Sequence, residues 1–338
     1  MALRLIEISL PEKDRPFVDG LLKDQAVLQV WQECLSGEQI LLRILLSAEE
    51  TEPLLDRLEK RFSGADGFRI ILLPVEAAIP RPKPPEETPA APSATSASAP
   101  ERKPARISRE ELYARITDSS RLSTVYLVMV VLSTIVAAIG LLRDNMTIEI
   151  GAMVLAPLLG PNMALSLATT LGDGALARRA LKATASGILV AFLISAGAGL
   201  LFPFPANSVE MISRTKVGLG DVGLALVSGA AGALAFTTGV PATLIGVTVA
   251  VALLPPLVTF GLSLGAGHSA MALGALLLLL ANVICVNLAG VTTFVLQGIH
   301  PLSWWEADRA KRATRNAIAL WAVLLGALVV VILFSRRT

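Results

Sequence analysis

Two stretches of the sequence decide the predicted fold: GAMVLAPLLGPNMALSLATTLGDGALA, residues 151–177, and GVTVAVALLPPLVTFGLSLGAGHSAMA, residues 246–272. Both are apolar and nearly free of charge, as a membrane-spanning helix requires. One constant offset aligns Gly151 with Gly246, Pro161 with Pro256 and Gly172 with Gly267. Proline inside a helix removes a backbone donor and interrupts the helix. The two stretches therefore indicate an internal repeat of broken transmembrane helices.

The composition of the whole chain also indicates a membrane protein. Of its 338 residues, 54% are hydrophobic and only 17% are charged, with a mean hydropathy of +0.66, which soluble proteins rarely reach. Because most charges fall before Arg121, in a linker, or between His300 and Arg315, we expect one part of the chain in water and another in lipid.

Apolar segments of about 20 residues, the length that spans a bilayer, predict seven transmembrane helices. Their ranges are 123–141, 147–170, 181–202, 221–238, 243–265, 270–297 and 316–334, within a transmembrane domain at 123–335. The offset maps the first three spans onto the next three. Since three is odd, the two copies would cross the membrane in opposite directions. The predicted fold class is a polytopic α-helical membrane protein with an inverted 3+3 repeat plus one extra span, an arrangement common in transporters.

Basic residues predict the orientation of these spans. One group precedes the first span: Arg106, Arg109, Arg115 and Arg121. A second lies in the connection between the second and third spans: Arg178, Arg179 and Lys182. A third lies between the sixth and seventh spans: Arg309, Lys311, Arg312 and Arg315. The positive-inside rule places all three groups in the cytoplasm. The first residues lack the features of a secretory signal. We expect a bacterial or archaeal cytoplasmic (inner) membrane, with the N-terminus in the cytoplasm.

The residues before the first span predict three different segments. Residues 1–77 alternate as strand, helix, strand, strand, helix and strand, which is the order of an α+β ferredoxin-like soluble domain. Residues 78–106 form a Pro/Ala/Ser tract with too few apolar side chains for a core, and a disordered linker is expected. Residues 107–122 fit an amphipathic helix on the membrane surface, or an ordinary solvated helix.

The interrupted helices supply the candidate site. Proline frees backbone carbonyls that hydrocarbon cannot solvate, so these groups should face another helix, water or a ligand. Kinks satisfied by neighbouring helices are the other interpretation. The candidate residues of the substrate or ion pathway are Pro157, Gly160, Pro161, Asn162, Pro255, Pro256, Thr259, Asn282 and Asn287. Asn282 and Asn287 lie about 140° apart around one helix, so at least one of them is expected to form an interhelical hydrogen bond.

Acidic residues at the span ends allow two interpretations. Glu149, Asp173 and Asp221 lie near the start or the end of spans. We favour solvation at the membrane interfaces over a role in proton coupling.

Motifs of enzymes and of metal sites are missing from the sequence. His268 and His300 have no neighbouring Cys or carboxylate pair at metal-ligand spacing. There is no phosphate-binding GxxxxGK[ST] loop and no GxSxG nucleophile motif. We expect no enzyme activity, no cofactor, no metal and no nucleic-acid partner.

Several quoted motifs resemble one family. MVLAPLLGPNMALSLATTLGDGALARRALK at 153–182, VTVAVALLPPLVTFGL at 247–262 and SWWEADRAKRATR at 303–315 resemble the DUF389 family of bacterial and archaeal membrane proteins. RLIEISLPEKD at 4–14 and ISREELYARI at 107–116 extend the resemblance over most of the chain. The family name denotes a domain of unknown function, so the resemblance implies a membrane architecture and no substrate.

Two functions fit these observations. The first is a channel or secondary transporter for a small ion or solute, with the N-terminal domain as a cytoplasmic regulator. Exposed carbonyls would favour a cation and helix N-termini an anion, so the sign of the solute stays open. The second is a membrane sensor or scaffold that recruits a partner without transport. The expected partners are the lipid bilayer, a small ion or solute and, through small-residue helix faces, a homo-oligomer.

Overall fold

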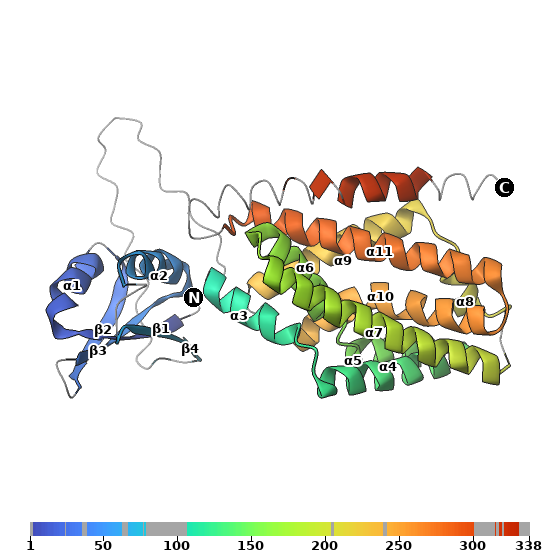
Figure 1. The fold of residues 1–338 in the computed structure, drawn as a ribbon, viewed down its shortest axis with the longest axis horizontal. Helices are drawn as coiled ribbons and strands as arrows, with labels where there is room; N and C mark the ends of the chain where they lie inside the picture. The colour runs from blue at the N-terminus through green and yellow to red at the C-terminus, as the bar shows by residue number, and fades with distance from the viewer. Residues whose placement is uncertain are drawn as a thin grey trace. The chain divides into compact units, whose positions relative to one another are not determined.

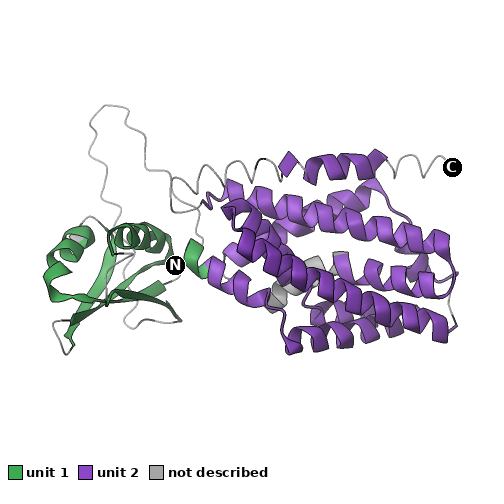
Figure 2. Cartoon of the chain, viewed as in Figure 1, with its two compact units in different colours: residues 1–111 green, residues 112–338 purple. Residues whose placement is uncertain are grey.

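The computed structural model describes residues 3–23, 25–35, 39–62, 67–76, 78, 107–203, 206–238, 242–300, 315, 318–319 and 321–330, with only the backbone described at 23 and 242–252. The predicted linker lies outside the described residues apart from residue 78, as does part of the predicted span 316–334. The chain divides into two compact units (Figure 2). We call Met1–Glu111 the sheet unit and Leu112–Thr338 the helical unit.

The sheet unit contains one antiparallel sheet with helices packed against it (Figure 1). Its elements are β1 (Leu3–Pro11), η1 (Glu12–Asp14), α1 (Arg15–Lys23), β2 (Val27–Cys34), β3 (Gln39–Ser47), α2 (Ala48–Phe62) and β4 (Arg69–Val75). The strands lie in the order β2-β3-β1-β4. Alternate residues of β1 are buried because successive side chains of a strand point to opposite faces. Ile6, Ile8 and Leu10 pack with Leu54 and Leu58 of α2 into one core. This is the order of elements that the sequence predicted.

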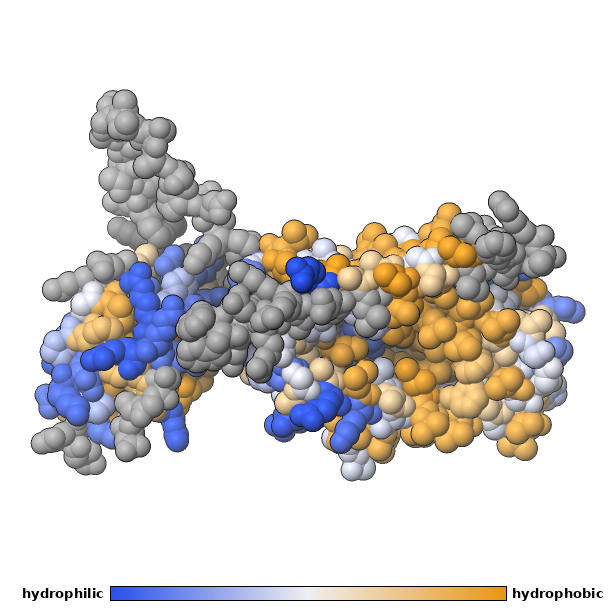
Figure 3. Space-filling view, turned by 45° about the horizontal axis from the view of Figure 1, so that its top comes forward, coloured by the Kyte–Doolittle hydropathy of each residue, from blue (hydrophilic) through white to orange (hydrophobic). Residues whose placement is uncertain are grey.

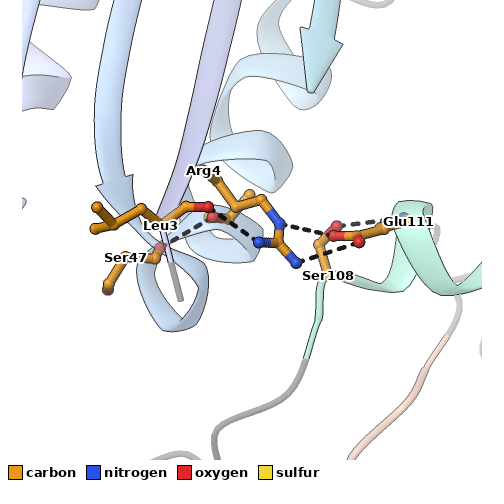
Figure 4. A network of polar contacts seen from close by, with 6 residues as sticks. Leu3, Arg4, Ser47, Ser108 and Glu111 are labelled. Atoms are coloured by element: carbon orange, nitrogen blue, oxygen red, sulfur yellow. Dashed lines mark hydrogen bonds and ion pairs between the residues drawn. The ribbon is translucent and has the colours of Figure 1, made fainter. Parts of the chain in front are cut away.

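The sheet unit also includes the first turn of α3 (Arg109–Ser119). The Arg4 guanidinium donates from Nε to Glu111 Oε2 at 2.9 Å and from Nη2 to Glu111 Oε1 at 3.2 Å (Figure 4). Ser108 Oγ accepts from the Glu111 amide. Both partners of this two-pronged ion pair are largely buried, at 8% and 12% side-chain exposure, so solvent screens the pair weakly. It fixes the start of α3 to β1.

Helices of different lengths make up the helical unit after α3. They are α4 (Thr124–Leu142), α5 (Met146–Leu155), α6 (Leu159–Leu171), α7 (Gly174–Leu201), α8 (Val209–Ser213), α9 (Leu219–Thr237), α10 (Ala242–Gly265) and α11 (Ser269–Leu296), with a further helix at Trp321–Val330. Apolar side chains gather over this unit and polar ones over the sheet unit (Figure 3).

Among the described residues, four helices are long and apolar enough to cross a membrane: α4, α7, α9 and α11. The pair α5 and α6 passes the same test as one bent span and makes a fifth. The other two predicted spans, 243–265 and 316–334, include shorter apolar helices at Leu253–Gly265 and Trp321–Val330. The apolar helices thus indicate a membrane protein, and the described residues include four or five of the seven predicted spans at full length.

The break between α5 and α6 follows from local chemistry. Ala156 precedes Pro157 and has an extended ψ of 119°, because a residue before proline is disfavoured in the helical region. Pro157 has no amide hydrogen to donate to the Met153 carbonyl. That carbonyl accepts a hydrogen bond from the Ala156 amide instead, at 3.3 Å. Pro161 occupies the first turn of α6, where an amide would have no helical partner in any case. Pro157 therefore produces the 51° bend between the two helices.

The second copy differs at the corresponding place. α10 keeps helical backbone through Pro255 and Pro256, so the sequence-based expectation of a matching break is not met there. Both prolines are buried, and α10 packs against α4, α5, α7, α9 and α11. A buried helix can tolerate the hydrogen bonds that proline removes, because neighbouring helices keep lipid away from the freed carbonyls.

Small residues bring α7 and α10 close together. A Cβ at Gly199 would overlap the Leu262 carbonyl, and a Cβ at Gly265 would overlap the Ala196 carbonyl. Gly261 and Gly265 are four residues apart, a spacing that permits helices to approach closely. Both pack against α7 of the same chain.

We predict that Gly199→Ala destabilises the helical unit by about 1–3 kcal/mol, the usual cost of overpacking. Gly197→Ala is the matched control two residues earlier in α7, since a Cβ there meets nothing within 4 Å, and should be neutral or slightly stabilising. Thermal unfolding in detergent measures both. Equal stability of the two variants would contradict the close packing.

Candidate functional site

α6 is buried on almost every side. Ten of its side chains are buried: Leu159, Gly160, Pro161, Asn162, Met163, Ala164, Ser166, Leu167, Ala168 and Thr170. It packs against α7 and α11 and ends at Gly172, whose φ of 72° is accessible to glycine without strain. A polar side chain on this helix must therefore find its partner inside the protein.

Three polar side chains from α6 and α11 meet in one network. Asn287 Nδ2 donates to Asn162 Oδ1 at 3.1 Å, and Ser166 Oγ donates to Asn287 Oδ1 at 3.2 Å. Asn162 Nδ2 donates to the Leu158 carbonyl at the start of α6, and Asn287 Nδ2 also donates to the Val283 carbonyl, each at 2.8 Å. We call Asn162, Ser166 and Asn287 the amide cluster.

The amide cluster joins two of the predicted site residues, Asn162 and Asn287, which are 125 residues apart. It confirms that one of the two asparagines of the sixth predicted span makes an interhelical hydrogen bond. Asn282 is buried on the same helix. Sequence reasoning missed Ser166, since a lone serine in an apolar helix carries no distinctive pattern.

Two hydroxyls of α10 are buried without hydrogen-bond partners among the described residues. Thr259 and Ser263 are each 0% exposed, and neither Oγ has a partner. Their spacing of four residues puts both on one face of the helix. Buried hydroxyls are normally paired, so this face has donor and acceptor capacity to offer a ligand.

The other predicted site residues have packing roles in the structure. A Cβ at Gly160 would overlap the Ser119 carbonyl, so glycine permits the end of α3 to approach α6. Pro161, Pro255 and Pro256 are buried and Pro157 is half-buried. Buried prolines agree with the requirement that their freed carbonyls avoid lipid.

A groove of about 780 Å³ lies elsewhere, between α4 and α7. Its lining is apolar apart from Arg143 at the end of α4, and none of the predicted site residues lines it. An apolar groove on the outside of a membrane unit suits acyl chains, and its lining offers no polar path.

The sequence predicts that three acidic residues at span ends are solvated, and the structure contradicts this at one of them. Asp173 caps α7 and accepts from Tyr113 Oη at 2.7 Å, and Asp221 accepts from the Gly218 amide, each at a helix end. Although partial burial opposes it, hydrogen bonds from the Leu176 amide and the Tyr113 hydroxyl lower the pKa of Asp173. Glu149, expected to be solvated, is 0% exposed, so that prediction was wrong.

No group of three His, Cys, Asp or Glu side chains placed to hold a metal ion occurs in the described part of the chain. The amide cluster and the hydroxyls of α10 are uncharged. They can recognise a ligand through hydrogen bonds and dipoles.

Comparison with known proteins supports the resemblance seen in the motifs. A family model described as "Domain of unknown function (DUF389)" matches residues 153–288, a range that includes every predicted site residue. An uncharacterized protein of Methanocaldococcus jannaschii, MJ0678, is 32% identical over 335 residues, which cover 99% of this chain and 100% of that protein. No solved structure matches the chain.

We predict a measurable coupling between Asn162 and Asn287. A double-mutant cycle with Asn162→Ala and Asn287→Ala should give about 0.6 kcal/mol, the average for hydrogen bonds within membranes, in unfolding experiments. A cycle that pairs Asn162→Ala with Ser133→Ala of α4, whose hydroxyl bonds within its own helix, should give none. Zero coupling in the first cycle would contradict the network.

Proposed function

The chain belongs to the DUF389 family, and from the geometry of its helical unit we propose that it is a channel or secondary transporter for a small ion or polar solute. One observation carries the proposal. A bent helix, α5–α6, brings Asn162 into a buried uncharged cluster with Ser166 and Asn287 inside a mainly apolar unit. Polar groups within a membrane are costly, and such groups commonly mark a path for solutes.

The chemistry of the path favours recognition by hydrogen bonds. The polar groups of the proposed path are dipoles without net charge. They are the amides of Asn162 and Asn287, the hydroxyls of Thr259 and Ser263, and the carbonyls freed by the prolines. Such a set replaces the hydration shell of a small ion or a polar solute, as carbonyl-lined filters do.

The element boundaries support the inverted repeat on which the proposal depends. α4 and α9 have 19 residues each and begin at Thr124 and Leu219, while α7 and α11 have 28 residues each and begin at Gly174 and Ser269. Both pairs differ by 95 positions (219 − 124 and 269 − 174), the same offset that aligns Gly151 with Gly246.

Tertiary contacts support the repeat as well. A Cβ at Gly290 of α11 would approach Ser166 Oγ of α6 to 2.7 Å, so these residues touch. Gly261 of α10 lies in the same way against Ser195 of α7. The offset carries Ser166 to Gly261 and Ser195 to Gly290. The two contacts are therefore equivalent, with serine and glycine exchanged between the copies.

The copies differ in one respect that suits transport. The helix of the first copy is broken at Pro157, whereas α10 of the second continues as one helix through its prolines. In transporters with inverted repeats, alternating access arises when one repeat rocks against the other around a fixed site. We infer that, during a transport cycle, the helix of the first copy becomes continuous while the helix of the second copy becomes broken, and that both then return.

The remaining parts of the chain fit this proposal. We place the protein in a bacterial or archaeal cytoplasmic membrane with the sheet unit in the cytoplasm, where it regulates flux. A homo-oligomer is compatible with the proposal and is not needed for it. We propose no enzymatic step and no nucleic-acid partner.

Flux into proteoliposomes, measured over a panel of small cations, anions and neutral metabolites, tests the function. Replacing both partners of a buried hydrogen bond with apolar groups of similar shape keeps the fold. The double variant Asn162→Leu, Asn287→Leu should therefore stay folded and lose flux about tenfold or more, since a lost buried hydrogen bond costs about 1–3 kcal/mol.

Thr134→Val of α4 is the control, because its hydroxyl bonds only to the Val130 carbonyl of its own helix. Its flux should match the wild type. An absence of flux for every solute, with folded protein, would reject the proposal and favour a sensor or scaffold that recruits a partner.

A further inference from the structure

Glu149 lies in the first turn of α5 and is completely buried. The turn between α4 and α5 is tight at this point, because a Cβ at Gly140 would lie 3.0 Å from the Glu149 amide. Neither carboxylate oxygen accepts a hydrogen bond from any described residue. A buried carboxylate with unmade hydrogen bonds is costly, so its position calls for a functional explanation.

One cation faces this carboxylate. Arg214, which ends α8, places Nη2 3.3 Å from Glu149 Oε1 and 3.6 Å from Glu210 Oε2. Arg214 and Glu210 are also mostly buried, at 18% and 17% side-chain exposure, and Arg214 Nε is unpaired. Two carboxylates thus share one guanidinium, and the cluster lacks one positive charge.

Among the described residues, the other cations at this end, Arg143 after α4 and Lys216 after α8, form no ion pair with Glu149. The helices packed against α5 in the helical unit, α4 and α10, have no charged residue within their ranges. Asp144, the remaining acid at this end, accepts from the Val209 and Glu210 amides and holds the start of α8. Within the described chain, Arg214 is the only cation in ion-pair range of Glu149.

We propose that Glu149 is a proton-binding residue that couples proton movement to solute flux, with Arg214 as the cation that it releases on protonation. This inference rests on the proposed transport function. A proton adds to the Glu149 carboxylate and makes it a neutral carboxylic acid, so the net charge of the cluster rises from −1 to zero. Arg214 then pairs with Glu210 alone, which lies one turn earlier on α8.

The release of Arg214 changes how α8 is held. In the structure α8 is fixed to the α4–α5 turn by Asp144 at its start and by the Arg214–Glu149 pair at its end. Met211 between them is fully buried in the core that includes Leu254 and Leu257 of α10. Protonation removes one of the two polar links and leaves α8 free to lift at its end. The charge state of Glu149 is thereby coupled to α10, the central helix of the unit.

Infrared difference spectroscopy of the purified full-length protein tests proton binding without any flux. As the pH falls, the wild type should gain the carbonyl band of a buried protonated carboxyl group. Glu149→Gln should lack this band, and Glu210→Gln should retain one. Arg214→Gln should show the band at higher pH, since the neighbouring cation is gone. Identical spectra for the wild type and Glu149→Gln would overturn the proposal.

Flux under an imposed pH gradient tests the coupling. The wild type should show flux that rises at least tenfold with the gradient, and Glu149→Gln should show gradient-independent flux. Wild-type flux that ignores the gradient would overturn the coupling even if the infrared band is present. A Glu149 band in a protein without flux for any solute would instead show that proton binding stands while the transport function fails. If Glu149→Gln does not fold, Arg214→Gln is used in its place for both the infrared and the flux measurements.

Discussion

The helical unit depends on one constraint: a backbone group surrounded by apolar side chains must find its hydrogen-bond partner inside the protein. The break at Pro157 obeys this rule, because the Met153 carbonyl accepts from the Ala156 amide and α6 is buried between α7 and α11. Asn162 donates to the Leu158 carbonyl directly after the break. The same constraint explains why Pro255 and Pro256 lie within α10, the most enclosed helix, where no lipid reaches them.

Close packing depends on small residues where helices cross. Gly199, Gly261 and Gly265 allow α7 and α10 to approach until backbone nearly touches backbone, and Gly290 does the same for α11 beside Ser166. Dispersion and interhelical hydrogen bonds hold such contacts in lipid, where burying apolar surface supplies no driving force. The Ser166–Gly290 and Ser195–Gly261 contacts are equivalent, and each packs a serine of the first copy against a glycine of the second copy.

Charge is distributed according to its cost. Most ion pairs among the described residues lie in the sheet unit. Arg43 pairs there with Glu7 and Glu33 on the sheet surface, and solvent screens these two pairs. In the helical unit the Glu149–Arg214 pair is buried, and removing its counter-charge would leave an isolated carboxylate in a medium of low dielectric constant. Such a group is retained where its charge has a use. In the two proposals made above, the amide cluster serves uncharged recognition and Glu149 serves as a titratable switch.

The sequence by itself determined what depends on neighbours along the chain. Apolar length located the helices, Pro157 located the break, and the offset of 95 positions between Gly151 and Gly246 matched the repeated helix boundaries. Alternation of apolar residues gave the strands of the sheet unit. Only the tertiary structure decided what depends on neighbours in space: the continuation of α10 through two prolines, the pairing of Asn162 with Asn287, the entry of Ser166 into that network and the burial of Glu149. Helical periodicity records which face of a helix is apolar, but the partner that satisfies a polar group comes from another segment, and no local pattern identifies it.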